Sequence, residues 1–400
     1  MLTRRMALAG SAAMAAPAVT RAQGAPIRIG EINSYTAIPS FTVPYRNGWQ
    51  LAVDEINTKG GVLGRPLAVI SRDDAGKPQD AVRLAEDLLD GQNVALLAGG
   101  YLSNVGLAIS DFARQRKCVY VAGEPLTDAL VWEKGNPYCF RLRPSTYMQA
   151  AMLVEEAAKL PAKRWVSVAP NYEYGLSTVK WFKALLGARR PDVTFVAAQW
   201  PALGKIDAGA TVAALAEAKP DAILNVTFGP DLTNFVRQGN TRGLFEGRAV
   251  VSVLTGEPEY LVPLGDETPE GWIVTGYPQD QVHTPANTAF ILAYQKRFGA
   301  LPGMGSVVGY SLIHSIAAGI ARAGSLQADK LITGFAGATF PTPFGTASYR
   351  ALDHQSTLGT FVGRTAVKDG KGVMVDWHYA DGAAYLPTDE QVKAMRPAAG

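Results

Sequence analysis

The sequence predicts an α/β protein with two doubly wound parallel-sheet lobes. Apolar segments of strand length alternate with helical-period segments from Ile27 to Leu142, and the same alternation resumes from Tyr147 to Thr275. Strands that alternate with helices of about 10–15 residues are typical of parallel sheets covered on both faces. The 400 residues suffice for two domains, and 48% hydrophobic residues suit two packed cores.

Five strands are predicted in the first unit, at Ile27–Ile32, Leu67–Ser71, Ala95–Ala98, Val119–Ala122 and Phe140–Leu142. A helix is predicted at Gly48–Asn57, where apolar residues recur on one face, and Gly60-Gly61 end it. Pro78 opens the next helix, because a first turn does not need its missing N–H. A third helix is predicted from Asn104.

The second unit repeats this order with strands predicted at Trp165–Ala169, Val193–Ala198, Ala222–Val226, Ala249–Leu254 and Gly271–Thr275. The last hundred residues do not form a third unit, and we expect them to complete the two lobes. They hold helices at Ala286–Phe298 and Ser306–Arg322, followed by short β segments. The second of these helices is apolar but carries several polar residues, which favours a buried amphipathic helix over a membrane span.

The N-terminus predicts a signal peptide over residues 1–22 and therefore export to the periplasm. Arg4-Arg5 precede the apolar stretch Met6–Val19, which is too short to span a membrane, and small residues surround Ala22. The paired arginines fit a twin-arginine signal or an ordinary secretory one. The formal net charge of +3 disappears once the leader arginines are removed. No nucleic-acid partner is expected for such a neutral chain.

No catalytic or metal-binding pattern is present in the sequence. It lacks a G-x-S-x-G elbow, a P-loop and a His-Glu-x-x-His motif, and its four histidines are scattered. We expect no cofactor and no enzyme activity, so a secreted α/β hydrolase or transferase is the weaker alternative. Cys118 and Cys139 each begin a predicted strand, and they could form a disulfide or remain buried thiols.

Ligands in open α/β sheets bind outside the carboxyl ends of the strands. Tyr35, Phe41 and Tyr45 follow the first predicted strand, and Gly99–Asn104 forms a glycine turn that enters a helix. Backbone N–H groups at that helix N-terminus suit an anionic group. The other strand ends with polar or aromatic residues are Gly123–Thr127, Tyr172–Gly175, Thr227–Gly229 and Thr255–Glu257.

Several segments resemble the leucine/isoleucine/valine-binding proteins, in order along nearly the whole mature chain. They are Ile27–Gly30, Leu51–Asn57, Lys59–Arg65, Asp73-Asp74, Pro78, Ala81-Val82, Phe140-Arg141, Pro144, Gln149 and Tyr174-Gly175. The resemblance implies a type I periplasmic-binding fold with three crossovers between the lobes. It also implies a monomer that clamps a small ligand and delivers it to an ABC permease in the inner membrane.

The resemblance also implies the binding residues. It assigns the ligand carboxylate to Leu102, Ser103 and Asn104 together with Glu124–Thr127, which includes Leu126 and Thr127. It assigns the ligand ammonium to Glu257, and aromatic walls to Phe41, Tyr174 and Phe228, with Tyr101 as a further candidate. Simpler alternatives are core packing for the aromatic residues, an N-cap role for Ser103, and solvated helix-start acids for Glu124 and Glu257.

Two departures from the family pattern leave the ligand open. Glu124-Pro125-Leu126 replaces small residues and a threonine, and a carboxylate there would repel an anionic ligand. Gly305 stands where some members have a large aromatic residue, which would enlarge the pocket. An aromatic or short-chain carboxylate, or an amide, is therefore the alternative to an amino-acid-like ligand.

The expected lobes combine separate stretches of chain. The N-terminal lobe is expected to hold residues 27–144 and 279–354, and the C-terminal lobe residues 145–278 and 355–400. The crossovers are expected near Pro144, Tyr277 and His354, where hinge closure would bury the ligand.

Overall fold

The first sheet is wholly parallel and has the strand order β2-β1-β3-β4-β5. In the computed structural model, which describes residues 24–396, its strands are β1 (Ile27–Asn33), β2 (Leu67–Asp73), β3 (Leu96–Gly99), β4 (Tyr120–Ala122) and β5 (Cys139–Arg141). Strands β3, β4 and β5 are buried along their whole length, as parallel strands covered on both faces are. The predicted signal peptide lies outside the described residues.

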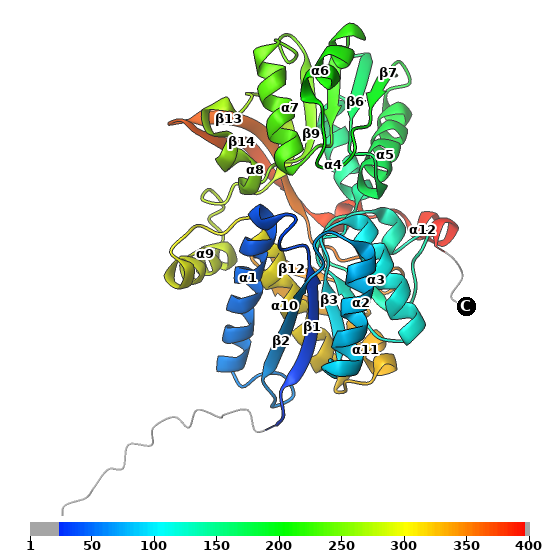
Figure 1. Ribbon diagram of the computed structural model, residues 1–400, viewed down its shortest axis with the longest axis vertical. Helices are drawn as coiled ribbons and strands as arrows, with labels where there is room; N and C mark the ends of the chain where they lie inside the picture. The colour runs from blue at the N-terminus through cyan, green and yellow to red at the C-terminus, as the bar shows by residue number, and fades with distance from the viewer. Residues whose placement is uncertain (1–23, 397–400) are drawn as a thin grey trace, which may run out of the picture.

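Helices cover both faces of this sheet (Figure 1). They are α1 (Pro39–Thr58), α2 (Pro78–Glu86), α3 (Ser103–Arg116), α9 (Pro285–Phe298), α10 (Met304–Ala323) and α11 (Ala328–Phe335). Helix α1 packs against α10, and α2 packs against α3. A small antiparallel hairpin, β11 (Thr339–Thr342) and β12 (Gly345–Ser348), completes the first lobe.

Helix α1 begins nine residues earlier than the sequence predicted, at Pro39 instead of Gly48. Phe41 and Tyr45 therefore lie on a buried helix face and not in a loop. The predicted start rested on the apolar periodicity from Gly48 onwards, whereas the helix also includes Pro44, which removes one helical hydrogen bond. The carbonyl left without its helical donor is that of Ser40 in the exposed first turn, where water can bond to it.

The second sheet is mixed and has the order β14-β13-β10-β9-β8-β6-β7. Its strands are β6 (Arg164–Val168), β7 (Thr194–Gln199), β8 (Ala222–Asn225), β9 (Ala249–Gly256), β10 (Ile273–Gly276), β13 (Thr360–Lys368) and β14 (Lys371–Ala380). The prediction of a parallel sheet holds for β6–β10, but β13 and β14 are antiparallel. The chain returns from the first lobe at the carboxyl end of β10, so β13 has to run in the opposite direction.

The helices of the second lobe are α4 (Thr146–Ala157), α5 (Glu173–Arg189), α6 (Ala208–Glu217), α7 (Gly229–Thr241) and α8 (Pro258–Leu264). Three chain segments cross between the sheets, at residues 142–145, 277–284 and 349–359. The first and third crossovers are hydrogen-bonded to each other, because Arg141 N donates to His354 O at 3.1 Å and Ser356 N donates to Arg141 O at 2.9 Å. The predicted two-lobed fold with three crossovers is confirmed.

The last helix, α12 (Asp389–Met395), lies beside the crossovers. Arg396, which follows it, donates to the carbonyl oxygens of Val131 and Asp353 at 2.6 and 2.7 Å. Residues that precede the helix contact the second lobe, since Tyr385 donates to Glu155 at 2.8 Å. The C-terminal segment therefore touches both lobes next to the hinge.

Helix α10 is long and apolar enough to cross a membrane, yet it is a core helix of the first lobe. Within its 20 residues, 72% of the most apolar stretch is buried inside the protein. This burial agrees with the predicted buried amphipathic helix.

The two cysteines are free and buried, although Cys139 pairs in register with Tyr120, close to Cys118. Of the two alternatives left open by the sequence, the structure shows buried thiols. Burial raises the pKa of each thiol to about 11, which makes both unreactive at neutral pH.

Glu31 on β1 makes the stability of the first lobe sensitive to pH. Its carboxylate is buried and accepts hydrogen bonds from Ser71 Oγ at 2.6 Å and Tyr35 OH at 3.0 Å. Burial raises its pKa from 4.5 to about 7. Between these two pKa values, the folded protein keeps a proton on Glu31 that the unfolded chain has lost. The free energy of unfolding therefore falls as the pH rises through this range, by up to about 3 kcal/mol.

We expect the Glu31→Gln variant to lose this pH dependence, because glutamine does not titrate. The measurement is the free energy of unfolding from urea titrations at about pH 4.5 and pH 8. Glu270→Gln, which changes an exposed acid, is the control and should follow the wild type. An equal drop with pH in wild type and Glu31→Gln would contradict the prediction.

Candidate functional site

A small cavity lies between the lobes, where the carboxyl ends of the two sheets face each other. Its volume is about 10 Å³, which is about the space that one water molecule needs. The first lobe contributes Tyr101, Ser103, Glu124 and Leu126, and the second lobe contributes Tyr172, Tyr174, Phe228 and Leu254. The structure thus brings together six of the predicted binding residues, which are Tyr101, Ser103, Glu124, Leu126, Tyr174 and Phe228.

Aromatic rings form a continuous row across the two lobes. Phe41 contacts Tyr101 with ring centroids 5.1 Å apart, and Tyr101 faces Phe228 at 6.2 Å. Phe228 contacts Tyr174 at 5.7 Å, and Tyr174 faces Tyr172 at 6.1 Å. Phe41 does not line the cavity and supports Tyr101 from behind, so the core-packing alternative describes Phe41.

The loop before α3 is shaped by two glycines with positive φ, Gly99 at 101° and Gly100 at 81°. A side chain at Gly100 would lie 2.4 Å from the hydroxyl of Tyr120, so the turn needs glycine. Leu102 is the N-cap and lies towards Gly76 instead of lining the cavity. The turn therefore presents the start of α3 to the opposite lobe.

Ser103 is the first residue of α3, so the alternative that it is merely the N-cap is wrong. Its hydroxyl accepts a hydrogen bond from Thr127 N at 3.2 Å, which joins the two binding loops of the first lobe. Asn104 does not line the cavity, but its buried Oδ1 has no partner among residues 24–396. The free N–H groups of this helix start suit an anionic group.

Glu124 and Glu257 are fully buried, so their assignment as solvated acids is wrong. The side chain of Arg143, on the first crossover, lies between them and joins both lobes to the hinge. Its Nη1 donates to Glu124 Oε1 at 2.5 Å, and its Nη2 donates to Glu257 Oε1 at 2.7 Å. The carboxylate of Glu124, which was expected to repel an anionic ligand, is therefore paired with a cation.

Burial raises the pKa of Glu124 and Glu257, and Arg143 opposes that rise. Burial disfavours the charge on Arg143, but the two carboxylates raise its pKa above the ordinary value. The second oxygen of each carboxylate, Oε2, is buried and has no hydrogen-bond partner in the described chain. The hydroxyl of Tyr174 is also buried and has no hydrogen-bond partner within residues 24–396. Buried acceptors of this kind require donors, and a ligand can supply them.

Direct contacts between the lobes surround the cavity. Thr127 Oγ1 donates to Glu173 Oε1 at 2.9 Å, and the hydroxyls of Tyr101 and Tyr260 lie 3.3 Å apart. Glu259 of the second lobe accepts hydrogen bonds from Met304 N and Gly305 N at the start of α10. These contacts hold the lobes in a closed arrangement. Thr127 takes part in this closure and does not line the cavity.

Gly305 does not enlarge the pocket, and that expectation is wrong. A Cβ atom at Gly305 would lie 2.4 Å from the carbonyl oxygen of Phe41 on α1. The position is occupied by the backbone of a neighbouring helix, so its small size serves helix packing.

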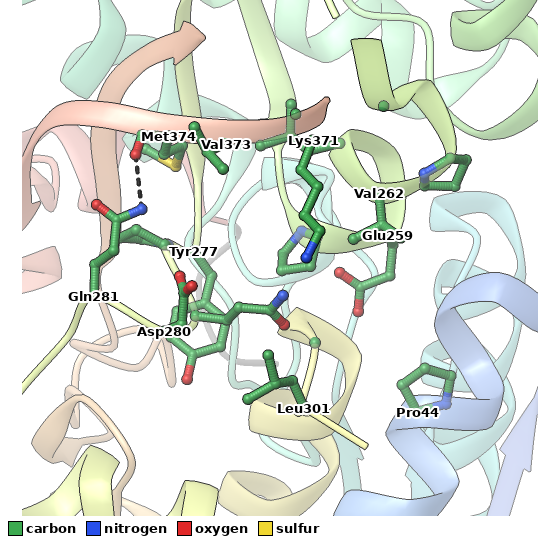
Figure 2. A pocket seen from close by; sticks show the side chains of 18 of the residues that line it. Pro44, Glu259, Val262, Tyr277, Asp280, Gln281, Leu301, Lys371, Val373 and Met374 are labelled. Carbon is green, nitrogen blue, oxygen red and sulfur yellow. Dashed lines mark hydrogen bonds between the residues drawn. The ribbon is translucent and has the colours of Figure 1, made fainter. Parts of the chain in front are cut away.

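A larger groove of about 630 Å³ opens between the lobes beside the second crossover (Figure 2). Pro44 and Leu301 of the first lobe, Val262 and Lys371 of the second, and Tyr277 of the crossover form its walls. These walls are mainly apolar and in part solvent-exposed. We place the site in the smaller cavity, because Glu124 and Tyr174, which line it, have buried polar atoms without partners in residues 24–396. Glu257 does not line the cavity and is connected to Glu124 through Arg143.

Arg143, Tyr172 and Leu254 belong to the site but were absent from the predicted binding residues. The signal for Arg143 was a charged residue inside the apolar segment that leads to the first predicted crossover. No cluster of His, Cys, Asp or Glu suited to a metal ion occurs within residues 24–396.

Two α/β lobes joined by three crossovers, with convergent polar groups buried between them, define a two-lobed solute-binding protein. The family model described as "Periplasmic binding protein" matches residues 26–371. The chain therefore belongs to the periplasmic binding protein family.

Relatives and solved structures agree with this assignment. The chain is 27% identical to Leu/Ile/Val-binding protein homolog 7 of Brucella abortus, over 68% of this chain and 69% of that protein. It is 25% identical to the leucine-, isoleucine-, valine-, threonine- and alanine-binding protein of Pseudomonas aeruginosa, over 89% and 92% of the two chains.

Among solved structures, the fold is similar to that of an ABC-transporter solute-binding protein of Rhodopseudomonas palustris in complex with 3,4-dihydroxybenzoic acid. The TM-score is 0.80, the identity is 23%, and the match covers 89% of this chain and 98% of that chain. At this identity the likeness shows the fold alone.

Proposed function

We propose that this protein captures a small amino-acid-like ligand between its lobes in the periplasm and delivers it unchanged to the permease of an ABC importer. One relative named above is a binding protein for five amino acids and the other is a homolog of Leu/Ile/Val-binding proteins, which supports the ligand class. The solved structure with the same fold is a solute-binding protein of an ABC transporter, which supports the transport role. The observation that carries the proposal is the pair of buried carboxylates, Glu124 and Glu257, each with one oxygen that has no donor within the described residues 24–396.

The site suits a molecule that carries both an ammonium and a carboxylate. An ammonium placed between Glu124 Oε2 and Glu257 Oε2 would give both oxygens charge-assisted hydrogen bonds. A carboxylate placed at the start of α3 would meet backbone N–H groups and the favourable end of the helix dipole. The rings of Tyr101, Tyr174 and Phe228 would pack against an apolar side chain.

Ligand entry requires the lobes to separate, because the closed cavity of about 10 Å³ is too small for an amino acid. We place the moving bodies at residues 27–144 with 279–354 and at residues 145–278 with 355–400. Rotation would occur about the three crossovers. The ligand would favour closure only through contacts that it makes in the closed state.

An aromatic carboxylate is the second candidate ligand. The row of rings favours it, and a protein with this fold binds 3,4-dihydroxybenzoic acid. A bare anion would face two carboxylates and a single guanidinium, which disfavours it. A neutral amide avoids that repulsion and would supply N–H donors to the same oxygens.

Glu257→Gln tests the proposal. Glutamine keeps an oxygen for Arg143 but loses the charge that attracts an ammonium, so we expect amino-acid binding to weaken about 10- to 100-fold. Isothermal titration with neutral amino acids, hydroxybenzoates and amides measures the change, and Glu270→Gln, at an exposed site, is the matched control. Unchanged affinity for the best amino acid rejects the role of Glu257, and heat from hydroxybenzoates alone would establish the second candidate.

A further inference from the structure

Arg143 places a positive charge of the protein itself beside Glu124, which lines the binding cavity. Its side chain is 2% exposed, and it comes from the first crossover between the lobes. Its two terminal nitrogens are divided between Glu124 and Glu257, on opposite lobes. The guanidinium thus takes one oxygen from each carboxylate and leaves the other free.

The charges around this group leave one negative charge uncompensated. The charged groups that act on Glu124 are Arg143, Glu257 and Glu259. Glu259 faces away to the start of α10, where two backbone N–H groups satisfy both of its oxygens. Two carboxylates and one guanidinium therefore remain at the site, where Glu124 lines the cavity and Glu257 is connected to it through Arg143. A buried charge without a partner is strongly unfavourable. In the empty site a proton on one of the two carboxyls removes that charge, in keeping with the raised pKa of both, and a ligand that brings one positive charge takes the place of this proton.

We propose that Arg143 is the specificity-determining residue of the site. It neutralises one of the two carboxylates and so restricts the ligand to a single ammonium group. This inference rests on the proposed function and deepens it. A neutral amino acid brings one ammonium, and its carboxylate is met by the start of α3. Arginine or lysine brings a second cation, for which the guanidinium of Arg143 leaves no negative partner.

The test compares the charge preference of three proteins by isothermal titration with the best-binding neutral amino acid and with L-arginine. We expect the wild type to bind the neutral amino acid at least 10-fold more tightly. The Arg143→Met variant keeps an apolar side chain of similar length but exposes both carboxylates, so it should lose at least 10-fold of that affinity and gain arginine binding. Methylguanidinium ions should restore neutral amino-acid binding, and tetramethylammonium at the same concentration should not.

The double variant Arg143→Met with Glu124→Gln keeps the assignment testable where the single variant is unstable. It removes one positive and one negative charge, so one carboxylate again remains. We expect it to regain the preference for the neutral amino acid. Arg114→Met, on the exposed face of α3, is the control for the substitution itself and should behave as the wild type. Circular dichroism melts confirm that each variant is folded.

The outcomes distinguish a failure of the Arg143 assignment from a failure of the proposed function. The assignment of Arg143 is overturned if the wild type binds a neutral amino acid, Arg143→Met keeps the same preference for it over L-arginine, and methylguanidinium does not change binding by that variant. A double variant that binds arginine best overturns it as well. If the wild type binds no ammonium compound, the proposed function fails, and the assignment fails with it.

Discussion

Replacement of Arg141 by methionine is expected to lower the free energy of unfolding by about 3–5 kcal/mol. Arg141 is fully buried at the end of β5, and its Nε donates to Gln355 Oε1 on the third crossover at 2.6 Å. Its Nη1 donates to the carbonyl oxygens of Leu126 and Thr127 in the binding loop. Burial lowers its pKa to about 10, so it remains charged at neutral pH.

Methionine at this position removes all three hydrogen bonds and leaves the buried Gln355 Oε1 without a donor, while Leu126 O and Thr127 O keep those from Thr146 N and Leu130 N. The loss of a fully buried, hydrogen-bonded guanidinium accounts for the large effect. Urea titration measures the loss of stability, and isothermal titration of the same variant should show weaker ligand binding because the loop at residues 126–127 loses its anchor. Arg83→Met on α2, with a side chain 68% exposed, is the control and should stay within about 0.5 kcal/mol of the wild type. A loss below about 1 kcal/mol for Arg141→Met contradicts the prediction.

The second large effect is expected at Gly309, where α1 and α10 touch backbone to backbone. A Cβ atom at this position would lie 2.0 Å from Tyr45 O and 2.9 Å from Trp49 N. Neither atom can rotate away, because both belong to the backbone of α1. The helices would have to separate, so we expect Gly309→Ala to cost about 3 kcal/mol.

Gly187→Ala is a matched control for this prediction. Gly187 also lies in a helix, α5, but its added Cβ would meet nothing within 4 Å. Alanine is the better helix former, so the control should gain up to about 1 kcal/mol. Thermal unfolding followed by circular dichroism distinguishes the two. Equal stability of Gly309→Ala and the wild type would show that α1 and α10 can move apart without cost.

Most strands and helices could be predicted because local periodicity reports burial. The segment Val119–Ala122 is apolar throughout, and Phe140–Leu142 is apolar except for Arg141, which matches strands buried on both faces. The start of α1 could not be predicted in the same way, because Pro44 lies inside the helix, where proline is unfavourable, and is tolerated since the carbonyl that it leaves unpaired is that of the exposed Ser40. The direction of β13 could not be predicted from local periodicity either, because it depends on the end of β10 at which the chain re-enters the sheet.

The sequence by itself determined the fold class and the strand ends where the site lies, because both follow from periodicity along the chain. Only the tertiary structure decided which charges meet there. Arg143 is hydrogen-bonded to Glu124 and Glu257, which are 19 and 114 positions away in the sequence, and these pairings depend on how the two lobes close. Gly305 follows the same rule, since its neighbour Phe41 belongs to a distant helix and no local pattern shows how much space surrounds it.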